Sequence, residues 1–361
     1  MSRVILAMSG GVDSSVAAWL LREAGHEVVG LFMRHGQQDE PVCATGGSPG
    51  GRRRGGCCTA ADAADARRVA DRLHIPFYSL NFEQDFQRIV HYFVTEYTAG
   101  RTPNPCVVCN TWLKFGRLVE YADGLGAQRI ATGHYARLLP GENGTWALCR
   151  GLDPTKDQAY VLWGIRREIV PRLMFPIGEH RKQEVRAIAD RLGLGQVAEK
   201  PDSQEICFVP DGNHARFVRE HRGPVDTSGE IVTTDGTVVG RHDGLEQFTI
   251  GQRKGLGVAF GTPRFIIRLE PETHRVVVGA REELARWELL ANGANWLREM
   301  ETVFDAEVKI RYRSVPVEAT IVKLAGDRFR VAFHRACYGI APGQAAVCYQ
   351  GDQVLGGGWI E

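Results

Sequence analysis

One short loop near the N-terminus constrains this chain most: residues 9–15, with the sequence Ser-Gly-Gly-Val-Asp-Ser-Ser. The apolar run at residues 4–8 is typical of a buried parallel strand. The apolar-periodic stretch at 16–24, which ends at Gly25, is typical of a helix. Such a strand-to-helix turn directs backbone N–H groups and a positive helix end toward one point. We therefore expect an anion, most often a phosphate, to bind there.

The loop has residues suited to phosphate binding, but it contains no lysine. Gly10 and Gly11 let the backbone approach a ligand closely, and the three serines offer hydroxyl donors. The pattern is neither G-x-x-x-x-G-K-[ST] nor G-x-G-x-x-G. An ordinary turn capped by Asp13 or Ser14 is the alternative. The complete pattern at the first strand of an α/β sequence argues against that alternative.

Composition is that of an ordinary globular protein. The 361 residues allow two or three domains, and the net charge of +1 requires any nucleic-acid contact to come from local patches. The sequence has neither a charged-then-apolar leader nor a long apolar run, so we expect a cytoplasmic protein without membrane contact. The nine cysteines indicate cytosolic thiols, some of them catalytic or metal-binding, rather than a disulfide framework.

Strands and helices alternate through the first half of the chain. Strands are expected at 27–33, 75–81 and 129–132, a hairpin at 136–149, and helices at 59–73 (capped by Thr59), 83–98, 112–125, 157–173 and 182–192. Residues 36–56 lack periodicity, which predicts a mobile loop. The alternation predicts an α/β fold with a doubly wound parallel sheet and a ligand at the carboxyl ends of its strands.

The later part of the chain changes to short β-runs, so we expect domains at 1–205, 206–285 and 286–361. The glycine-rich second segment predicts a small central domain, and regular short strands in the third predict a closed β-barrel. Along an expected strand at 304–312, Lys309, Arg311 and Arg313 alternate onto one face. That face is either a phosphate-contacting stripe or a solvated surface.

Residues 101–110, Arg-Thr-Pro-Asn-Pro-Cys-Val-Val-Cys-Asn, form the second informative stretch. Its two prolines predict an extended loop. Cys109 precedes an expected helix whose N-terminal end favours a thiolate. Cys207, between Ile206 and Phe208, is the other candidate for a reactive cysteine. A buried structural thiol is the alternative interpretation of Cys207.

The first loop resembles the signature of the PP-loop ATP pyrophosphatases, which hold ATP while adenylating a substrate. Further segments resemble one family of that superfamily, the tRNA-specific 2-thiouridylases, in the same order. These segments are SGGVDSS, RTPNP-x-x-x-CN with KF, ATGHYAR, GLDPTKDQAY, KPDSQEICF, FTIGQRKGLGV, KIRYR and PGQAAVCY. The resemblance spans essentially the whole chain.

The resemblance implies that ATP, with Mg²⁺ on its phosphates, adenylates O2 of the wobble uridine in certain tRNAs. Adenylation turns that oxygen into a leaving group. The residues implied to contact ATP are Ala7, Met8, Ser9, Gly10, Gly11, Val12, Asp13, Ser14, Ser15, Met33 and Gly133. The resemblance also implies a catalytic role for Asp13.

The resemblance implies that Cys207 carries a persulfide from a sulfur donor, either a cysteine desulfurase or a sulfur-relay protein. The terminal sulfur would attack C2, and Cys109 would resolve the intermediate by forming a disulfide with Cys207. Asn104, Pro105 and Cys106 would lie against the flipped uridine. The other residues implied to contact tRNA are His134, Lys156, Asp157, Gln158, Arg311, Tyr312 and Gln344.

One position departs from the family pattern. Many members have an aspartate, proposed to act as a base, where this chain has Cys106. Three thiols at Cys106, Cys109 and Cys207 would suit a 4Fe-4S cluster that carries the sulfur. A structural zinc with Cys57 or Cys58 as fourth ligand is another alternative. Two other functions fit part of the pattern: a different adenylating PP-loop ligase, and a non-catalytic RNA-binding protein.

Overall fold

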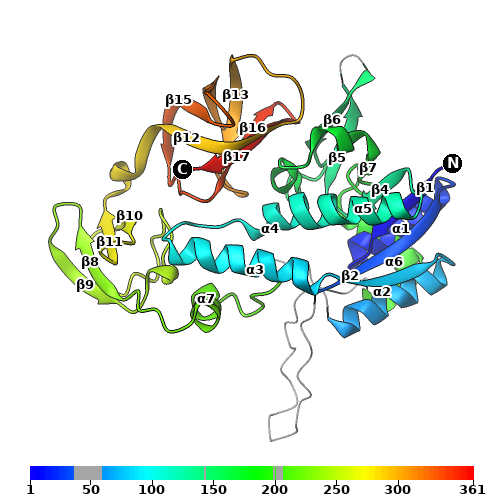
Figure 1. Cartoon of the computed structure of the whole chain (residues 1–361), viewed down its shortest axis with the longest axis horizontal. Helices are drawn as coiled ribbons and strands as arrows, with labels where there is room; N and C mark the ends of the chain where they lie inside the picture. Colours follow the sequence, from blue (N-terminus) through cyan, green and yellow to red (C-terminus); the bar gives the residue numbers. More distant parts are fainter. Residues whose placement is uncertain (36–58, 142–143, 198–199, 201–205) are drawn as a thin grey trace, which may run out of the picture. The chain divides into compact units, whose positions relative to one another are not determined.

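The computed structural model describes residues 1–35, 59–141, 144–197, 200 and 206–361 (Figure 1). They divide into two units, each of which is described by itself. The first unit comprises Met1–Arg88 and Cys109–Gly212, and the second comprises Ile89–Val108 and Asn213–Glu361. The loop expected at 36–56 lies outside the described residues. None of the described helices is long and apolar enough to cross a lipid bilayer.

A parallel sheet with the strand order β3-β2-β1-β4-β7 is the framework of the first unit. Its strands are β1 (Arg3–Ala7), β2 (Glu27–Arg34), β3 (Phe77–Asn81), β4 (Arg129–Thr132) and β7 (Leu173–Met174). The central strand β1 pairs with β2 and β4, and Ala7 lies opposite both Leu31 and Thr132. The segments that follow these strands therefore begin at one edge of the sheet. The predicted parallel sheet is confirmed.

Helices cover this sheet because β1 is apolar and buried from its second residue to its end. Val4 and Leu6 are completely buried in a core shared with α1, α2 and α6. The helices of this unit are α1 (Val12–Glu23), α2 (Ala60–Arg72), α5 (Leu118–Gly124) and α6 (Lys182–Arg191). Helix α3 (Glu83–Thr98) begins in this unit and continues into the second. Thr59 caps α2 as predicted, since its hydroxyl accepts a hydrogen bond from Asp62 N at 3.2 Å.

The helix predicted at 157–173 is wrong. Two short 3₁₀ helices, η3 (Ala159–Leu162) and η4 (Arg167–Arg172), occupy this segment. Gly164 lies between them, where a Cβ would come within 2.4 Å of Thr111 Oγ1. Pro171 removes a backbone donor from the second helix. The predicted hairpin, by contrast, is present as the antiparallel pair β5 (Ala136–Pro140) and β6 (Trp146–Arg150).

The second unit contains a four-stranded sheet with the order β10-β11-β8-β9. Its strands are β8 (Gly229–Thr233), β9 (Val238–His242), β10 (Phe265–Glu270) and β11 (Arg275–Gly279). Helix α7 (His214–Arg222) precedes the sheet and was not predicted from the sequence. Only Ala215 and Val218 of this helix are buried, so its apolar periodicity is weak.

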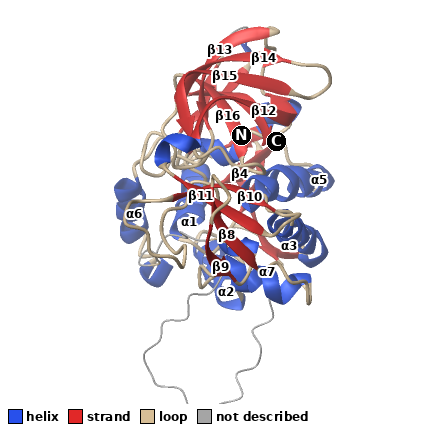
Figure 2. Ribbon diagram, turned by 90° about the vertical axis from the view of Figure 1, so that its left-hand side faces the viewer, coloured by secondary structure: helices blue, strands red, loops and turns tan. Residues whose placement is uncertain are grey.

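The C-terminal strands of the second unit form a closed six-stranded barrel (Figure 2). They are β12 (Ala285–Trp296), β13 (Val303–Lys309), β14 (Val317–Lys323), β15 (Phe329–Tyr338), β16 (Ala345–Gln350) and β17 (Gln353–Ile360). The barrel closes because β12 pairs with both β15 and β17. The predicted barrel is confirmed, but the sequence analysis missed β12.

Near α7, a buried carboxylate connects three parts of the second unit. Glu246 accepts hydrogen bonds from Arg219 Nε at 2.6 Å, Arg222 Nη1 at 2.7 Å and Thr227 Oγ1 at 2.6 Å. Its side chain is fully buried. Burial raises the pKa of Glu246, but these hydrogen bonds outweigh burial and leave that pKa below its ordinary value of 4.5.

We predict that Glu246→Ala lowers the free energy of unfolding by about 3 to 5 kcal/mol, because Arg222 would remain buried without its partner. The cost should be fully present above the ordinary glutamate pKa of 4.5 and should shrink as the pH falls through the lowered pKa. Hydrogen exchange of residues 214–280, followed from pH 7 downward, measures both effects.

The matched control is Glu270→Ala, because Glu270 pairs with Arg268 at an exposed position. It should cost less than about 1 kcal/mol. Equal exchange rates in the two variants would contradict the prediction for Glu246.

Candidate nucleotide and thiol site

The turn from β1 into α1 is closely packed against two other segments. Gly10 has a positive φ of 73°. A Cβ at Gly10 would lie 2.2 Å from Asp62 O, at the start of α2. A Cβ at Gly133, directly after β4, would lie 2.8 Å from Ser14 N. Both positions therefore require glycine, and the turn is held against α2 and β4.

Within the turn, two serine hydroxyls hold the loop itself. Ser14 Oγ and Ser15 Oγ donate to Gly11 O at 3.1 and 2.9 Å, and Ser9 N donates to Ser14 Oγ at 3.2 Å. The N-cap residue of α1, Gly11, offers no side-chain acceptor to the first backbone N–H groups of the helix. The positive end of α1 thus lacks a side-chain cap at the loop. Ser9 is exposed, whereas Ser14 and Ser15 are buried.

Asp13 in this loop forms an ion pair with Lys182, a residue that the sequence analysis did not select. Lys182 Nζ lies 2.8 and 2.9 Å from the two carboxylate oxygens of Asp13. Tyr135 donates its hydroxyl to Asp13 Oδ1 at 2.8 Å. The Lys182 side chain is 9% exposed, while that of Asp13 is 32% exposed. The first residue of α6 therefore supplies the positive charge that the loop lacks.

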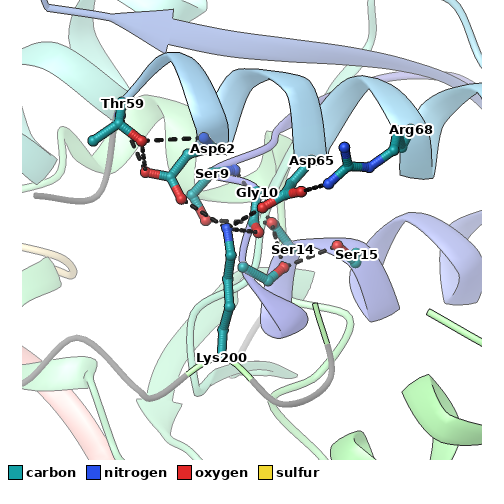
Figure 3. A network of polar contacts seen from close by, with 10 residues as sticks. Ser9, Gly10, Ser14, Ser15, Thr59, Asp62, Asp65, Arg68 and Lys200 are labelled. Atoms are coloured by element: carbon teal, nitrogen blue, oxygen red, sulfur yellow. Dashed lines mark hydrogen bonds and ion pairs between the residues drawn. The ribbon is translucent and has the colours of Figure 1, made fainter. Parts of the chain in front are cut away.

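A second lysine meets the other side of the turn. Figure 3 shows Lys200 directed at Gly10 and at the carboxylates of Asp62 and Asp65. Its Nζ lies 3.1 Å from Gly10 O and 2.8 Å from Asp62 Oδ1, and it also pairs with Asp65. Burial lowers the pKa of Lys200, but the two carboxylates outweigh burial and leave that pKa above its ordinary value. Lys200 therefore binds the turn to α2.

The segment predicted to contact tRNA at Lys156, Asp157 and Gln158 is attached to the same site. Asp157 Oδ1 accepts hydrogen bonds from the backbone N atoms of residues 151 and 159, both at 3.0 Å. Gln158 Oε1 accepts one from Tyr135 N at 2.9 Å. Asp153 Oδ2 accepts one from Lys182 N at 3.0 Å. These bonds fix the segment to the start of α6 and to the tyrosine that contacts Asp13.

His134 follows Gly133 and is 6% exposed. Its Nδ1 lies 2.7 Å from Thr132 Oγ1. Burial, reinforced by the charge of Lys114, holds the pKa of His134 well below its ordinary value. The ring is therefore neutral at physiological pH. Its predicted contact with tRNA stays a prediction.

The extended loop predicted for the prolines at 103 and 105 is wrong in its second half. Helix α4 (Pro105–Val108) begins at the second proline and runs directly into a π-helix, η1 (Cys109–Arg117). Asn104 caps this stretch, since its Oδ1 accepts from Val107 N at 3.2 Å. A proline at the first helical position loses no hydrogen bond, because the N–H there has no partner within the helix. Cys106 and Cys109 therefore lie in helical backbone.

Exposure differs among the cysteines. Cys106 is exposed, Cys109 and Cys207 are half-buried, and Cys149, Cys337 and Cys348 are buried. After Cys207, the buried ring of Phe208 meets Phe86 edge-on at 5.6 Å, and Phe86 stacks on His35 at 3.9 Å. No three His, Cys, Asp or Glu side chains in the described part of the chain are grouped to hold a metal ion. Cys57 and Cys58 lie outside the described residues.

The remaining predicted tRNA contacts lie in the second unit. Arg311 follows the end of β13 and donates from Nη2 to Ile250 O at 2.6 Å and Gly339 O at 2.8 Å. The expected strand is present but ends at Lys309, so the predicted face with three alternating cations is wrong. Tyr312 is 37% exposed, and its ring centroid lies 5.9 Å from Lys309 Nζ. Gln344 is bonded to Thr102 and Pro103.

Three family models together match most of the chain. The tRNA methyl transferase HUP domain matches residues 2–211, the tRNA methyl transferase PRC-barrel domain matches 215–280, and the aminomethyltransferase β-barrel domain matches 286–360. The first of these alone covers more than half of the sequence.

Two solved proteins that share part of the fold are only distantly similar to the chain. A 4-thiouridine synthetase–RNA complex with bound ATP is 17% identical, with a TM-score of 0.36, and the match covers 55% of this chain and 43% of that one. An NMN synthetase from Francisella tularensis is 15% identical, with a TM-score of 0.31, over 55% of this chain and 66% of that one. Likenesses this low carry no argument about the site.

Full-length relatives are much more similar. A protein of Rhodopirellula baltica named tRNA-specific 2-thiouridylase MnmA is 53% identical over 100% of this chain and 96% of its own length. A protein of the same name from Geotalea uraniireducens is 49% identical over 99% of this chain and 95% of its own length. With these similarities along its whole length, the chain belongs to the tRNA-specific 2-thiouridylase family.

Proposed function

We propose that this protein is a tRNA-uridine 2-sulfurtransferase, which uses ATP to replace O2 of the wobble uridine by sulfur. The observation that carries the proposal is the phosphate-type turn with its Asp13–Lys182 pair, in a chain with 2-thiouridylase relatives along its whole length. AMP and pyrophosphate would be the other products. The residues at 9–15 would hold the ATP phosphates against the N-terminus of α1.

The Lys182 ammonium and the Asp13 carboxylate would have different roles at the phosphates. Lys182 forms an ion pair with Asp13 in this structure. Once ATP is bound, the Lys182 ammonium would exchange this partner for a phosphate oxygen. The Asp13 carboxylate would then become available to Mg²⁺, which prefers carboxylate oxygens and neutralises phosphate charge. The residues present therefore fit a magnesium ion. Tyr135 would keep the carboxylate oriented through its hydrogen bond to Oδ1.

Sulfur transfer would follow in two steps. The terminal sulfur of a Cys207 persulfide attacks C2 of the adenylated uridine, a C–S bond forms, and AMP leaves with the former O2. The Cys109 thiolate then attacks Cys207 Sγ. That attack forms the Cys109–Cys207 disulfide and breaks the bond to the transferred sulfur, which stays on the base. A sulfur donor must then supply the next persulfide after the disulfide has been reduced.

Cys106 supports a second candidate mechanism for the same reaction. Its exposed side chain stands three residues before Cys109 in helical backbone, and with Cys207 it completes three thiols. A 4Fe-4S cluster held by these cysteines would deliver an exchangeable sulfide. We favour the relay through Cys207 and Cys109, because most of the sequence pattern matches the persulfide form of the family.

We predict that Lys182→Met weakens ATP binding by about ten- to a hundredfold, because a charge-assisted hydrogen bond contributes about 1.5 to 3 kcal/mol. Equilibrium dialysis with ATP and Mg²⁺ measures the affinity. The single variant leaves the Asp13 carboxylate without its partner, which could disturb folding. The double variant Asp13→Asn with Lys182→Met has no unpaired carboxylate, so comparing the two separates lost ATP binding from misfolding.

Lys323→Met is the control, because Lys323 lies in the barrel and its ammonium donates to Met300 O at 3.3 Å. It should leave ATP affinity unchanged. Wild-type affinity in both Lys182 variants would exclude this lysine from the phosphate site.

The cysteine variants separate the two mechanisms. We predict that Cys109→Ser and Cys207→Ser abolish 2-thiouridine formation from ATP, tRNA and a persulfide donor, while tRNA-dependent AMP formation continues. Cys106→Ala should keep thiolation if the relay operates. It should lose both thiolation and bound iron if a cluster operates. The assay is mass spectrometry of digested tRNA, with iron and acid-labile sulfide measured on protein purified without oxygen.

Other results would favour the rival functions. ATP consumption that needs neither tRNA nor thiolation, and that persists in both serine variants, would indicate another PP-loop ligase. Binding of tRNA with no AMP formation would indicate a non-catalytic RNA-binding protein. Either result in a folded preparation would contradict the proposed function.

A further inference from the structure

The segment that carries Asn104 and Cys106 is bonded to the loop between β15 and β16 of the barrel. Thr102 N donates to Pro342 O at 2.8 Å. Gln344 Nε2 donates to Thr102 O and to Pro103 O, both at 3.1 Å. Three consecutive polar groups of the 102–103 backbone are thus paired with a loop more than 200 residues away in sequence.

The packing between the two loops leaves little space for a side chain at Gly343. A Cβ there would lie 3.0 Å from Thr102 O and 3.1 Å from Arg101 Cβ, and the φ of 87° also disfavours other residues. Gln344 is itself fixed to the end of β17, because its carbonyl accepts from Ile360 N at 2.8 Å. The amide that holds the 102–103 backbone therefore stands on the closed barrel rather than on a mobile loop.

Helix α3 holds the same segment from another direction. Tyr92 OH accepts a hydrogen bond from Asn104 N at 3.4 Å, and Arg101 Nε donates to Glu96 Oε2 at 2.7 Å. The Tyr92 ring centroid lies 6.2 Å from that of Trp359 in β17. Asn104, fixed in this way, caps the helical stretch in which Cys106 stands.

We propose that Gln344 is a positioning residue, which holds Thr102 and Pro103 so that Asn104 and Cys106 are presented to the target base in one fixed arrangement. The assignment of this segment to the base rests on the proposed function. Resemblance implies that Gln344 contacts tRNA, whereas its amide group is already bonded inside the protein. The barrel would then contribute to catalysis by shaping the base site, in addition to any contact with tRNA.

Gln344→Ala and Gln344→Glu test this role in the full-length protein. Losing two hydrogen bonds should accelerate hydrogen exchange at Thr102 and Val107 about tenfold, and iodoacetamide should alkylate Cys106 faster. The glutamate variant should show the larger change, because its carboxylate would face two carbonyl oxygens. With thiolation as readout, kcat should fall at least tenfold while the Kd for tRNA stays within twofold of wild type.

Gln350→Ala is the matched control, because Gln350 is an exposed glutamine of the same barrel and accepts a hydrogen bond from Arg298 at 2.9 Å. It should leave exchange, alkylation and kcat at wild-type values. Wild-type exchange and alkylation in both Gln344 variants, with only a weaker Kd for tRNA, would overturn the proposal and make Gln344 a direct tRNA contact. Exchange and alkylation need no thiolation, so they decide the role of Gln344 even if the proposed reaction is never observed.

Discussion

The ion pair between Asp13 and Lys182 is the interaction on which the candidate nucleotide site depends. Two groups separated by 169 residues share two contacts below 3 Å, and the lysine is almost fully buried. A buried ammonium needs a carboxylate nearby, and the exposed face of that carboxylate lies at the positive end of α1. The pair therefore links the first loop, the start of α6 and the 153–158 segment into one arrangement. The pair also places at the loop the charges that a nucleotide would use under the proposed function.

The features that were predicted correctly from the sequence depend on residues that are close together in the chain. The strand at 4–8, the glycine-containing turn and the cap at Thr59 follow from local patterns, and each is present. The helix expected at 157–173 is wrong in part because the local signals of Gly164 and Pro171 were outweighed by the apolar pattern around them. The close packing of Gly164 against Thr111 is a contact that no local pattern indicates. The helix at Pro105 was missed because proline was treated as a breaker, although it is favoured at a first helical position.

The sequence motifs of the candidate site could be predicted, but the ion pairs that surround it could not. Lys182 and Lys200 both lie far from their partners in sequence, 169 residues from Asp13 and 190 residues from Gly10. Each is an ordinary lysine in its local context, so only the fold reveals its role. Arg311 shows the reverse: its spacing indicated an exposed cation, but its guanidinium donates to two backbone carbonyls. Chemistry that depends on long-range pairing is thus invisible to pattern analysis.

The division of the chain into units has a consequence for how the protein can be taken apart. Residues 89–108 belong to the second unit, although sequence on both sides of them belongs to the first. A truncation after residue 212 would therefore release a fragment that still carries a piece of its neighbour, with the backbone groups of Thr102 and Pro103 unsatisfied. Exchanging the barrel between relatives would require exchanging this inserted segment too. The two units are interleaved along the polypeptide, and neither is a detachable module.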